Sequence, residues 1–245
     1  FLMYFSSFNR VPYLFGTETT PSAIQNLTTY ADMFDQIKDN ISFYKKEYIQ
    51  EGERPDQLSL RLYDTVDYYW TFYFLNDSLK SKGWPIDQQQ MINTIKDVFP
   101  NYSVTVRIDI TSKFSKGQDI IGQTSGARGT IVHKNFDMGQ LLIKLDPGSA
   151  EFQVGEIARS VNISSEVQTA ELFGASYEYL APRYYYSGKD VADFDPLQGP
   201  GALLTEKTYL DTWVEQNDEL RQINVVRPDY ILELESTFQK AVSET

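Results

Sequence analysis

Apolar side chains recur at helical spacing over residues 28–100 and predict a run of short helices. We expect the first helix over about 29–46, where a start resembling a capping box precedes an apolar face. A short strand should follow at 48–50, and a further short helix at 87–98. This part of the chain is therefore predicted to be mostly helical.

Two more helices are predicted inside this region by residues that favour helix starts. Pro55 suits the first turn of a helix that carries Leu58 and Leu62 on one face. Asp64 and Thr65 are good N-cap residues for a following helix. The apolar face of that helix falls at i, i+3, i+4, i+7 and i+8 and consists of Val66, Tyr69, Trp70, Tyr73 and Phe74.

From residue 103 to about residue 174 the apolar period changes to two, which is typical of half-buried strands. The clearest alternation is formed by Val104, Val106, Ile108 and Ile110. A weak internal repeat is also present, because the pattern of Phe114, Gly117 and Gln118 returns 38 positions later as Phe152, Gly155 and Glu156. Two matching hairpin units predict a small, self-contained β-barrel or β-roll made of two half-repeats.

The last part of the chain is expected to return to helices. Residues 175–200 have many Tyr, Pro and Gly residues and predict a loop. A helix over about 204–217, a strand over about 220–226 and a final helix after Pro228 should follow. Residues 1–27 mix aromatic residues with Pro and Gly and predict an irregular arm that is disordered alone or docked on a partner.

Composition narrows the class of function. The net charge of −12 is opposite to that of a nucleic-acid footprint and is unfavourable at an anionic membrane surface. The chain has no cysteine, which excludes disulfides and thiolate metal sites and fits a reducing compartment. It has 17 Tyr and 15 Phe, residues that give large contact surfaces at little cost in rotamer entropy. Part of this aromatic content is therefore expected to contact other proteins, and the rest to form the core.

The sequence contains few patterns that point to catalysis. The one histidine, His133, has no Ser or Cys nucleophile motif to complete a triad and is expected to be structural or solvated. Asp193 and Asp195 beside a proline are typical of an Asx-type turn. Residues 125–129 are rich in glycine but lack the Lys-Ser/Thr ending of a phosphate loop. We therefore predict no enzyme activity, no cofactor and no metal site.

Three segments, taken in order, resemble the small baseplate wedge protein of T-even-type contractile-tail phages. The first contains Tyr48-Ile49, Gly52, Arg54-Pro-Asp-Gln-Leu58 and Leu62-Tyr63. The second runs from Tyr69-Trp70 through Leu75-Asn-Asp77 to Gly83-Trp84. The third is Asn217-Asp-Glu-Leu-Arg-Gln-Ile223, followed by an α-helical C-terminus. The likeness covers roughly residues 1–100 and 175–245, which implies that the β segment between them is an inserted module.

This resemblance implies an α+β fold: a LysM-like βααβ core at about 48–91, an inserted small antiparallel β-barrel and a helical C-terminus. Its implied core residues are Tyr48, Gly52, Leu58, Leu62, Trp70 and Asn76. The Gly-Asp-Thr turn usual in LysM units is replaced here by Gly52-Glu-Arg-Pro-Asp56. The resulting domains would be an arm at 1–27, a helix with the LysM-like domain at 28–100, the β insert at 103–174 and a Tyr-rich loop with a C-terminal α/β segment at 175–245.

The resemblance also implies a structural function. The family member joins neighbouring wedges around the tail hub, which predicts six copies in the virion baseplate, assembly in the host cytoplasm, and other wedge and hub proteins as partners. The side chains expected to contact those partners are Phe1, Tyr4, Phe5, Phe8, Tyr13, Phe15, Trp84, Tyr184, Tyr185 and Tyr186. The alternative is a carbohydrate-binding module that holds peptidoglycan or chitin-type sugars through the LysM-like segment. A third hypothesis, a cell-wall hydrolase, lacks an acid/base pair that the sequence can locate.

Overall fold

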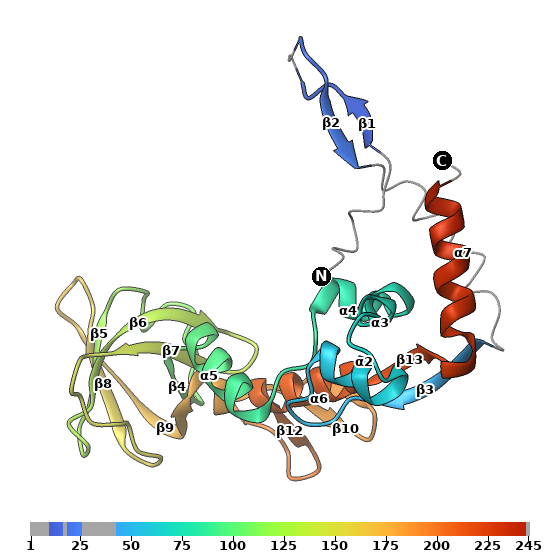
Figure 1. Ribbon diagram of the computed structural model, residues 1–245. Coiled ribbons are helices and arrows are strands. Elements are labelled where there is room, and N and C mark those ends of the chain that lie inside the picture. The colour runs from blue at the N-terminus through green and yellow to red at the C-terminus, as the bar shows by residue number, and fades with distance from the viewer. Residues whose placement is uncertain (1–9, 17–18, 26–42, 244–245) are drawn as a thin grey trace. The chain divides into compact units, whose positions relative to one another are not determined.

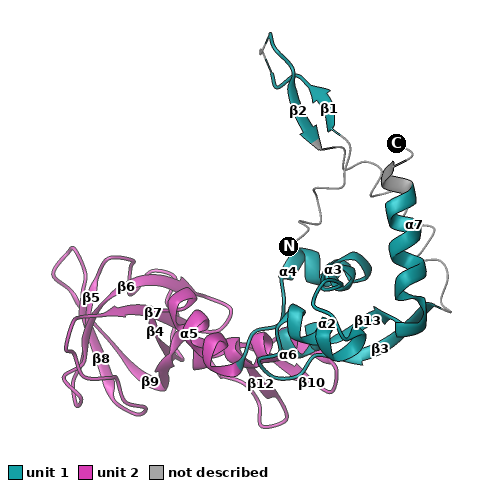
Figure 2. Cartoon of the chain, viewed as in Figure 1, with its two compact units in different colours: residues 1–87, 217–245 teal, residues 88–216 magenta. Residues whose placement is uncertain are grey.

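The structure, a computed structural model, describes residues 10–16, 19–25 and 43–243. It is a mixed α/β protein with two compact units (Figure 2). Unit 1 consists of residues 1–87 and 217–245, and unit 2 consists of residues 88–216. Unit 2 is therefore an insertion into the sequence of unit 1.

Unit 1 is built on a two-stranded antiparallel ribbon whose strands come from distant parts of the chain (Figure 1). Strand β3 (Tyr44–Tyr48) pairs with β13 (Gln222–Val226) along its whole length. Between them in sequence lie α2 (Pro55–Tyr63), α3 (Trp70–Leu75) and α4 (Asp77–Lys82). Because a lone two-stranded ribbon is marginally stable in water, these helices must supply its apolar cover.

Two adjoining clusters of buried side chains form the core of unit 1. The first joins α2, α3 and α4 to β13 and consists of Ile49, Leu58, Phe72, Leu79, Leu220, Ile223 and Val225. The second joins α3 to the C-terminal helix α7 (Ile231–Ser243), which follows a 3₁₀ turn at Pro228–Tyr230. This cluster consists of Phe74, Leu75, Val226, Ile231 and Leu234. Strand β13 thus contributes to both clusters, and its pairing couples the C-terminus to the helices.

Unit 2 contains helix α5 (Gln88–Val98) and six antiparallel strands that pair in a closed ring, in the order β4-β7-β6-β5-β8-β9. The strands are β4 (Tyr102–Val106), β5 (Asp119–Gly122), β6 (Arg128–Asn135), β7 (Gln140–Leu145), β8 (Ile157–Val161) and β9 (Val167–Tyr177). One apolar cluster fills the ring, with Val104, Phe114, Ile131, Ile143 and Leu172 among its most deeply buried members. The alternating apolar positions seen in the sequence therefore face this interior.

The internal repeat corresponds to two equivalent structural positions. Gly117 and Gly155 both have positive φ, at 88° and 83°. The Gly117 amide donates to the Ile131 carbonyl at 2.7 Å, and the Gly155 amide donates to the Leu172 carbonyl at 2.7 Å. In the same way Gln118 and Glu156 each accept a hydrogen bond from a nearby backbone amide. The repeated residues set the entry into β5 and β8 in the same way.

A small three-stranded sheet completes unit 2. It has the order β11-β10-β12, formed by β10 (Pro182–Ser187), β11 (Asp190–Ala192) and β12 (Thr205–Thr208). A 3₁₀ turn at Glu178–Leu180 precedes it, and α6 (Tyr209–Arg221) follows and continues into unit 1. The prediction of a loop over 175–200 is therefore wrong, because β-branched and aromatic residues between the Gly and Pro positions are enough for short strands.

The structure also contains a separate antiparallel hairpin of β1 (Arg10–Tyr13) and β2 (Ser22–Gln25). This hairpin replaces part of the irregular arm predicted for residues 1–27. Most of the helix predicted over 29–46 lies outside the described residues, but residues 44–46 belong to β3 and not to a helix. No helix within the described ranges has both the length and the apolarity needed to cross a membrane.

The helix predicted directly after Asp64 and Thr65 begins later, at Trp70. Asp64 has φ 57° and ends α2 in the left-handed conformation. The Ser59 hydroxyl then donates to the Thr65 carbonyl at 2.7 Å and accepts from the Tyr68 amide at 3.2 Å, so the intervening residues form a turn. The side chain of Ser59 is fully buried. A tertiary contact thus overrides the capping signal.

The inserted unit is longer at both ends than the predicted β insert. The insertion covers residues 88–216 and not only 103–174, because α5 and the sheet of β10–β12 group with the barrel. No strand occurs within 77–87, and residues 77–82 are helical. The second strand expected inside 48–91 is therefore absent there, and β13 takes the place beside β3.

Candidate functional site

The three segments that resemble the wedge protein meet in unit 1, at a place formed by residues 48–53, 76–87 and 217–226, here called the junction. Its backbone link is a 2.9 Å hydrogen bond from the Ile49 amide to the Arg221 carbonyl. This bond extends the β3–β13 pairing toward α2. The rest of the junction is held by side chains.

Two asparagine side chains act as pairing partners for backbone groups. Asn76 Nδ2 donates to the Asn224 carbonyl at 2.8 Å, and the Asn224 amide donates to Asn76 Oδ1 at 2.9 Å. Asn217 forms the same pair with Ile86, with both distances 2.9 Å. Asn76 is 7% exposed. Its side-chain amide makes the two hydrogen bonds to β13 that a neighbouring strand would otherwise make, and so satisfies these backbone groups.

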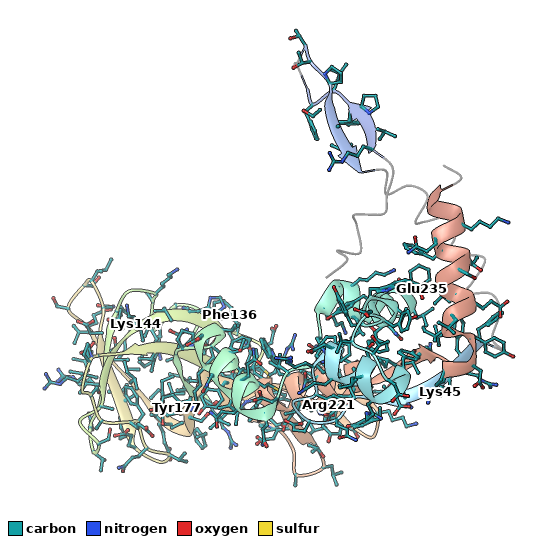
Figure 3. All side chains as sticks on the ribbon, in the orientation of Figure 1. Lys45, Phe136, Lys144, Tyr177, Arg221 and Glu235 are labelled. Carbon is teal, nitrogen blue, oxygen red and sulfur yellow. The ribbon has the colours of Figure 1, made fainter. Side chains whose placement is uncertain are left out.

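Arg221 connects the third segment to the first. Its side chain is 5% exposed, and its guanidinium forms an ion pair with Glu51 and donates to the Ile86 carbonyl at 3.3 Å. Asp218 lies 3.5 Å from its Nε. Figure 3 labels Arg221 near the end of α6. A buried guanidinium requires such partners, because an unpaired buried charge is strongly destabilising.

The loop after β3 is fixed by an aromatic and a charged contact. Trp84 Nε1 donates to the Glu53 carbonyl at 2.7 Å, and its ring packs on Phe72 at 6.0 Å. The Glu53 carboxylate in turn accepts from Arg61 at 2.7 Å. Arg61 also donates a hydrogen bond to Glu47. Burial raises the pKa of Glu47, but the hydrogen bonds from Arg61 and Lys45 outweigh burial and lower this pKa overall. This loop is therefore occupied by contacts within unit 1.

The residues predicted to contact partners lie in several environments. Phe1, Tyr4, Phe5 and Phe8 lie outside the described residues. Tyr13 and Phe15 stand at the β1–β2 hairpin, 52% and 50% exposed, with their rings 4.9 Å apart. Trp84, by contrast, is half-buried against the core of unit 1, with part of its surface open.

The three consecutive tyrosines are half-buried on β10 in unit 2. The Tyr185 ring packs edge-on against Phe194 at 5.0 Å, and Lys207 lies 6.0 Å from the Tyr186 ring. Burial is the main reason that the pKa of Tyr185 is raised. Tyr184 and Tyr186 share the other face of the strand, as expected from the period of two. Each thus contributes to the small sheet, with only part of its surface open.

The predicted LysM-like core residues are brought together in part. Leu58 is fully buried, Leu62 packs against the same cluster, and Trp70 lies 5.0 Å from Phe238 of α7. Tyr48 is 56% exposed, so its placement in the core was wrong. Gly52 has φ 69° with open space where a side chain would stand, so its role is the turn. Asn76 was predicted only as a core residue, but its side chain also pairs with the backbone of β13.

The residues considered for chemistry remain apart. His133 is exposed on β6, and Asp195 Oδ1 accepts from the Leu197 amide at 2.9 Å, as in an Asx turn. Residues 125–129 form the turn between β5 and β6 and the start of β6. No group of three or more His, Cys, Asp or Glu side chains in the described part of the chain is arranged to hold a metal ion.

Comparisons with known proteins give no family assignment. No protein-family model matches the chain, and no curated protein matches its sequence.

Sequence reasoning missed the two asparagine pairs and the buried carboxylate of Glu156. The Glu156 carboxylate accepts from the Ser125 amide at 2.9 Å and from the Gln153 amide at 2.6 Å. The repeat did mark this position, since Glu156 stands where Gln118 stands in the first half. The asparagine pairs had no comparable local signal, because their partners lie far away in the sequence.

Proposed function

We propose that this chain is a structural component of a contractile phage tail baseplate, which joins neighbouring wedges around the hub by protein–protein contacts. One observation carries the proposal. The three segments that resemble the wedge protein are separated in sequence, yet they pack together at the junction. A chance likeness of three short motifs would not require them to form one folded unit.

The arrangement of unit 1 supports a LysM-like core in a modified form. Strand β3, helices α2 and α3 and strand β13 supply the strand, two helices and strand of such a core, with α4 and the insertion lying between α3 and β13 in the sequence. We infer that the last strand is supplied from 222–226, after the insertion, and not from within 48–91. Within the described residues, this core is held by apolar packing and by hydrogen bonds between side chains and backbone, which suits a protein whose task is assembly.

The partner surface is proposed at the β1–β2 hairpin. Tyr13, Leu14 and Phe15 are each at least half exposed. An isolated two-stranded hairpin is marginal in water, so these aromatic and aliphatic side chains would gain stability by being buried in a partner. Aromatic residues of this kind often dominate the energy of protein interfaces.

Affinity capture of the full chain co-expressed with wedge subunits tests the proposal. The wild type should retain its partners and yield a ring-forming assembly in particle images. The double variant Tyr13→Ser, Phe15→Ser should lose at least about tenfold in affinity, since removing a buried aromatic anchor costs about 2 kcal/mol or more. Tyr69→Ser is the matched control, because Tyr69 is 42% exposed elsewhere in unit 1. A wild-type chain that captures no wedge subunit contradicts the proposal.

The carbohydrate-binding alternative stays a prediction with its own test. Trp84, Glu53 and Arg61, the side chains around the loop that would meet a sugar, already contact one another or the backbone. A sugar would have to displace these contacts. Titration of the full chain with chitin oligomers in a calorimeter at millimolar concentration should therefore give no heat, and a saturable signal would favour the alternative.

A further inference from the structure

Unit 2 contains a pocket of about 280 Å³ that plays no part in the proposed function. One wall is the outer face of β4 and β9, and the other comes from residues 180–206. Its volume lies just below the range usual for small-molecule sites, roughly 300–1,000 Å³. It is therefore large enough for one small ligand and too small for a folded partner.

The floor of the pocket holds a polar group without a partner. Ser103 is 2% exposed, and its Oγ has no hydrogen-bond partner among the described residues. Its neighbours Tyr102 and Val104 face the barrel interior, so Ser103 faces the pocket. A buried hydroxyl with no partner costs free energy, and a ligand or a water molecule that bonded it would remove that cost.

The same pocket is lined by one cation and one anion. Arg107 follows directly after the end of β4, four residues from Ser103, and also lines the pocket. Its guanidinium lies 4.2 Å from the centre of the Phe173 ring. Glu206 approaches from β12, directly opposite Tyr185 of β10. Neither Arg107 nor Glu206 forms an ion pair with another residue that the structure describes.

The Tyr185 hydroxyl is close enough to both Arg107 and Glu206 for each charge to affect its pKa. After burial, Glu206 is the next cause that raises the pKa of the Tyr185 hydroxyl, and Arg107 opposes it. Both charges therefore act on the same phenol, whose ring continues through Phe194 as an apolar wall. The pocket thus combines a donor for a carboxylate, an acceptor for an ammonium group and an aromatic surface.

We propose that this pocket binds a small zwitterion of the α-amino acid class with an apolar or aromatic side chain. Arg107 takes the carboxylate in a charge-assisted hydrogen bond, Glu206 takes the ammonium group, and the side chain packs on Phe173 and Phe194. A ligand with only a negative charge would be repelled by Glu206, and a ligand with only a positive charge would be repelled by Arg107.

Calorimetric titration of the full chain with three matched probes tests the proposal. The probes are L-phenylalanine, 3-phenylpropionate, which lacks the ammonium group, and phenethylamine, which lacks the carboxylate. L-phenylalanine should bind with a dissociation constant of 1 mM or below, and each of the other two about tenfold more weakly, since a charge-assisted hydrogen bond of roughly 1.5 kcal/mol is lost.

Variants separate the roles of the two charges. Arg107→Gln should weaken L-phenylalanine about tenfold and leave phenethylamine unchanged or tighter, because that probe has no carboxylate to lose and its ammonium group is no longer opposed by the arginine. Glu206→Gln should weaken L-phenylalanine and leave 3-phenylpropionate unchanged or tighter. Arg159→Gln, which removes an exposed arginine from β8, is the control and should change nothing.

Two results overturn the proposal. One is the absence of saturable heat with all three probes at 10 mM, which lies well above the expected dissociation constant. The other is binding that both Arg107→Gln and Glu206→Gln leave unchanged. Neither result bears on the wedge proposal, which rests on unit 1.

Discussion

Replacing Asn76 by alanine should lower the free energy of unfolding of unit 1 by more than the loss of its contacts at the end of α3 alone would. Asn76 ends α3 and is also the only described side chain that pairs with both backbone groups of Asn224. Its removal leaves an amide and a carbonyl of β13 without these partners in a part-buried region. Each such group costs about 1–3 kcal/mol when it is buried, so for two part-buried groups we expect a loss of about 2–3 kcal/mol in the free energy of unfolding of unit 1. The Phe72 carbonyl keeps a partner, because the Asn76 backbone amide also donates to it.

The assay must report unit 1 alone, because two compact units need not unfold together. The chain has three tryptophans; Trp70 and Trp84 lie in unit 1, and Trp213 lies in unit 2. In a Trp213→Phe background, indole fluorescence during urea unfolding therefore follows unit 1. The midpoint should fall in Asn76→Ala with an unchanged slope, which would indicate a change of stability rather than of compactness.

Asn224→Ala is the matched control for this prediction. The Asn224 side chain is exposed, and the contacts with Asn76 use only its backbone. That substitution should change stability by no more than about 0.5 kcal/mol. If Asn76→Ala and Asn224→Ala shift the midpoint equally, the side chain of Asn76 does not serve as a surrogate strand and the reasoning fails.

Three further predictions follow from single contacts. Burial raises the pKa of Glu156, but hydrogen bonds from Ser125 and Gln153 lower it overall. The ionised carboxylate therefore stabilises unit 2 above about pH 4.5, and this stabilisation is lost as the pH falls. In Glu156→Gln, the free energy of unfolding measured with urea should depend less on pH in this acidic range. Gly122→Ala would place a Cβ 2.6 Å from the Glu156 carboxylate and should lower the melting temperature of unit 2, visible by calorimetry. Burial and a hydrogen bond to Glu235 raise the pKa of Tyr68 to about 12, so wild-type stability should fall between pH 10 and 12 relative to Tyr68→Phe, measured by the same unfolding assay.

The sequence predicted the local elements of the fold better than their assembly. Pro55, the 87–98 pattern and the alternating residues after 103 led to helices and strands that the structure contains. These features depend on neighbours within one turn or one strand, which is the range that periodicity reports. The turn at 64–69 was missed because Ser59, a buried tertiary contact, decides it.

The long-range pairing of unit 1 was not predictable from periodicity alone. β3 and β13 are both short, and nothing in either segment specifies the other as its partner. The family resemblance placed residues 217–223 in a C-terminal segment apart from the 48–91 core, and it expected the second strand within 48–91, whereas β13 is the strand that pairs with β3. The asparagine pairs and the pocket in unit 2 likewise depend on residues that only the folded chain brings together.

The paired strands of unit 1 lead to a last prediction, the removal of unit 2. Ile86 and Asn217 are hydrogen-bonded to each other at 2.9 Å in both directions, so the chain leaves and re-enters unit 1 at one place. A linker of four Gly/Ser residues, each spanning up to about 3.5 Å, should therefore replace residues 88–216 without strain. Closing a shorter loop favours pairing of β3 with β13 by about 1 kcal/mol, because the loop between these strands becomes roughly 3.6-fold shorter.

The excised chain should show slow hydrogen exchange at the amides of β13 and an emission maximum for Trp70 and Trp84 like that of the Trp213→Phe full chain. Introducing Asn217→Ala into the excised chain should weaken protection, because it opens the contact that holds the two ends together. Rapid exchange throughout β13 in the excised chain would mean that unit 1 needs unit 2 in order to fold. The two units would then be one cooperative structure, and the insertion would be part of the architecture of unit 1 rather than an addition to it.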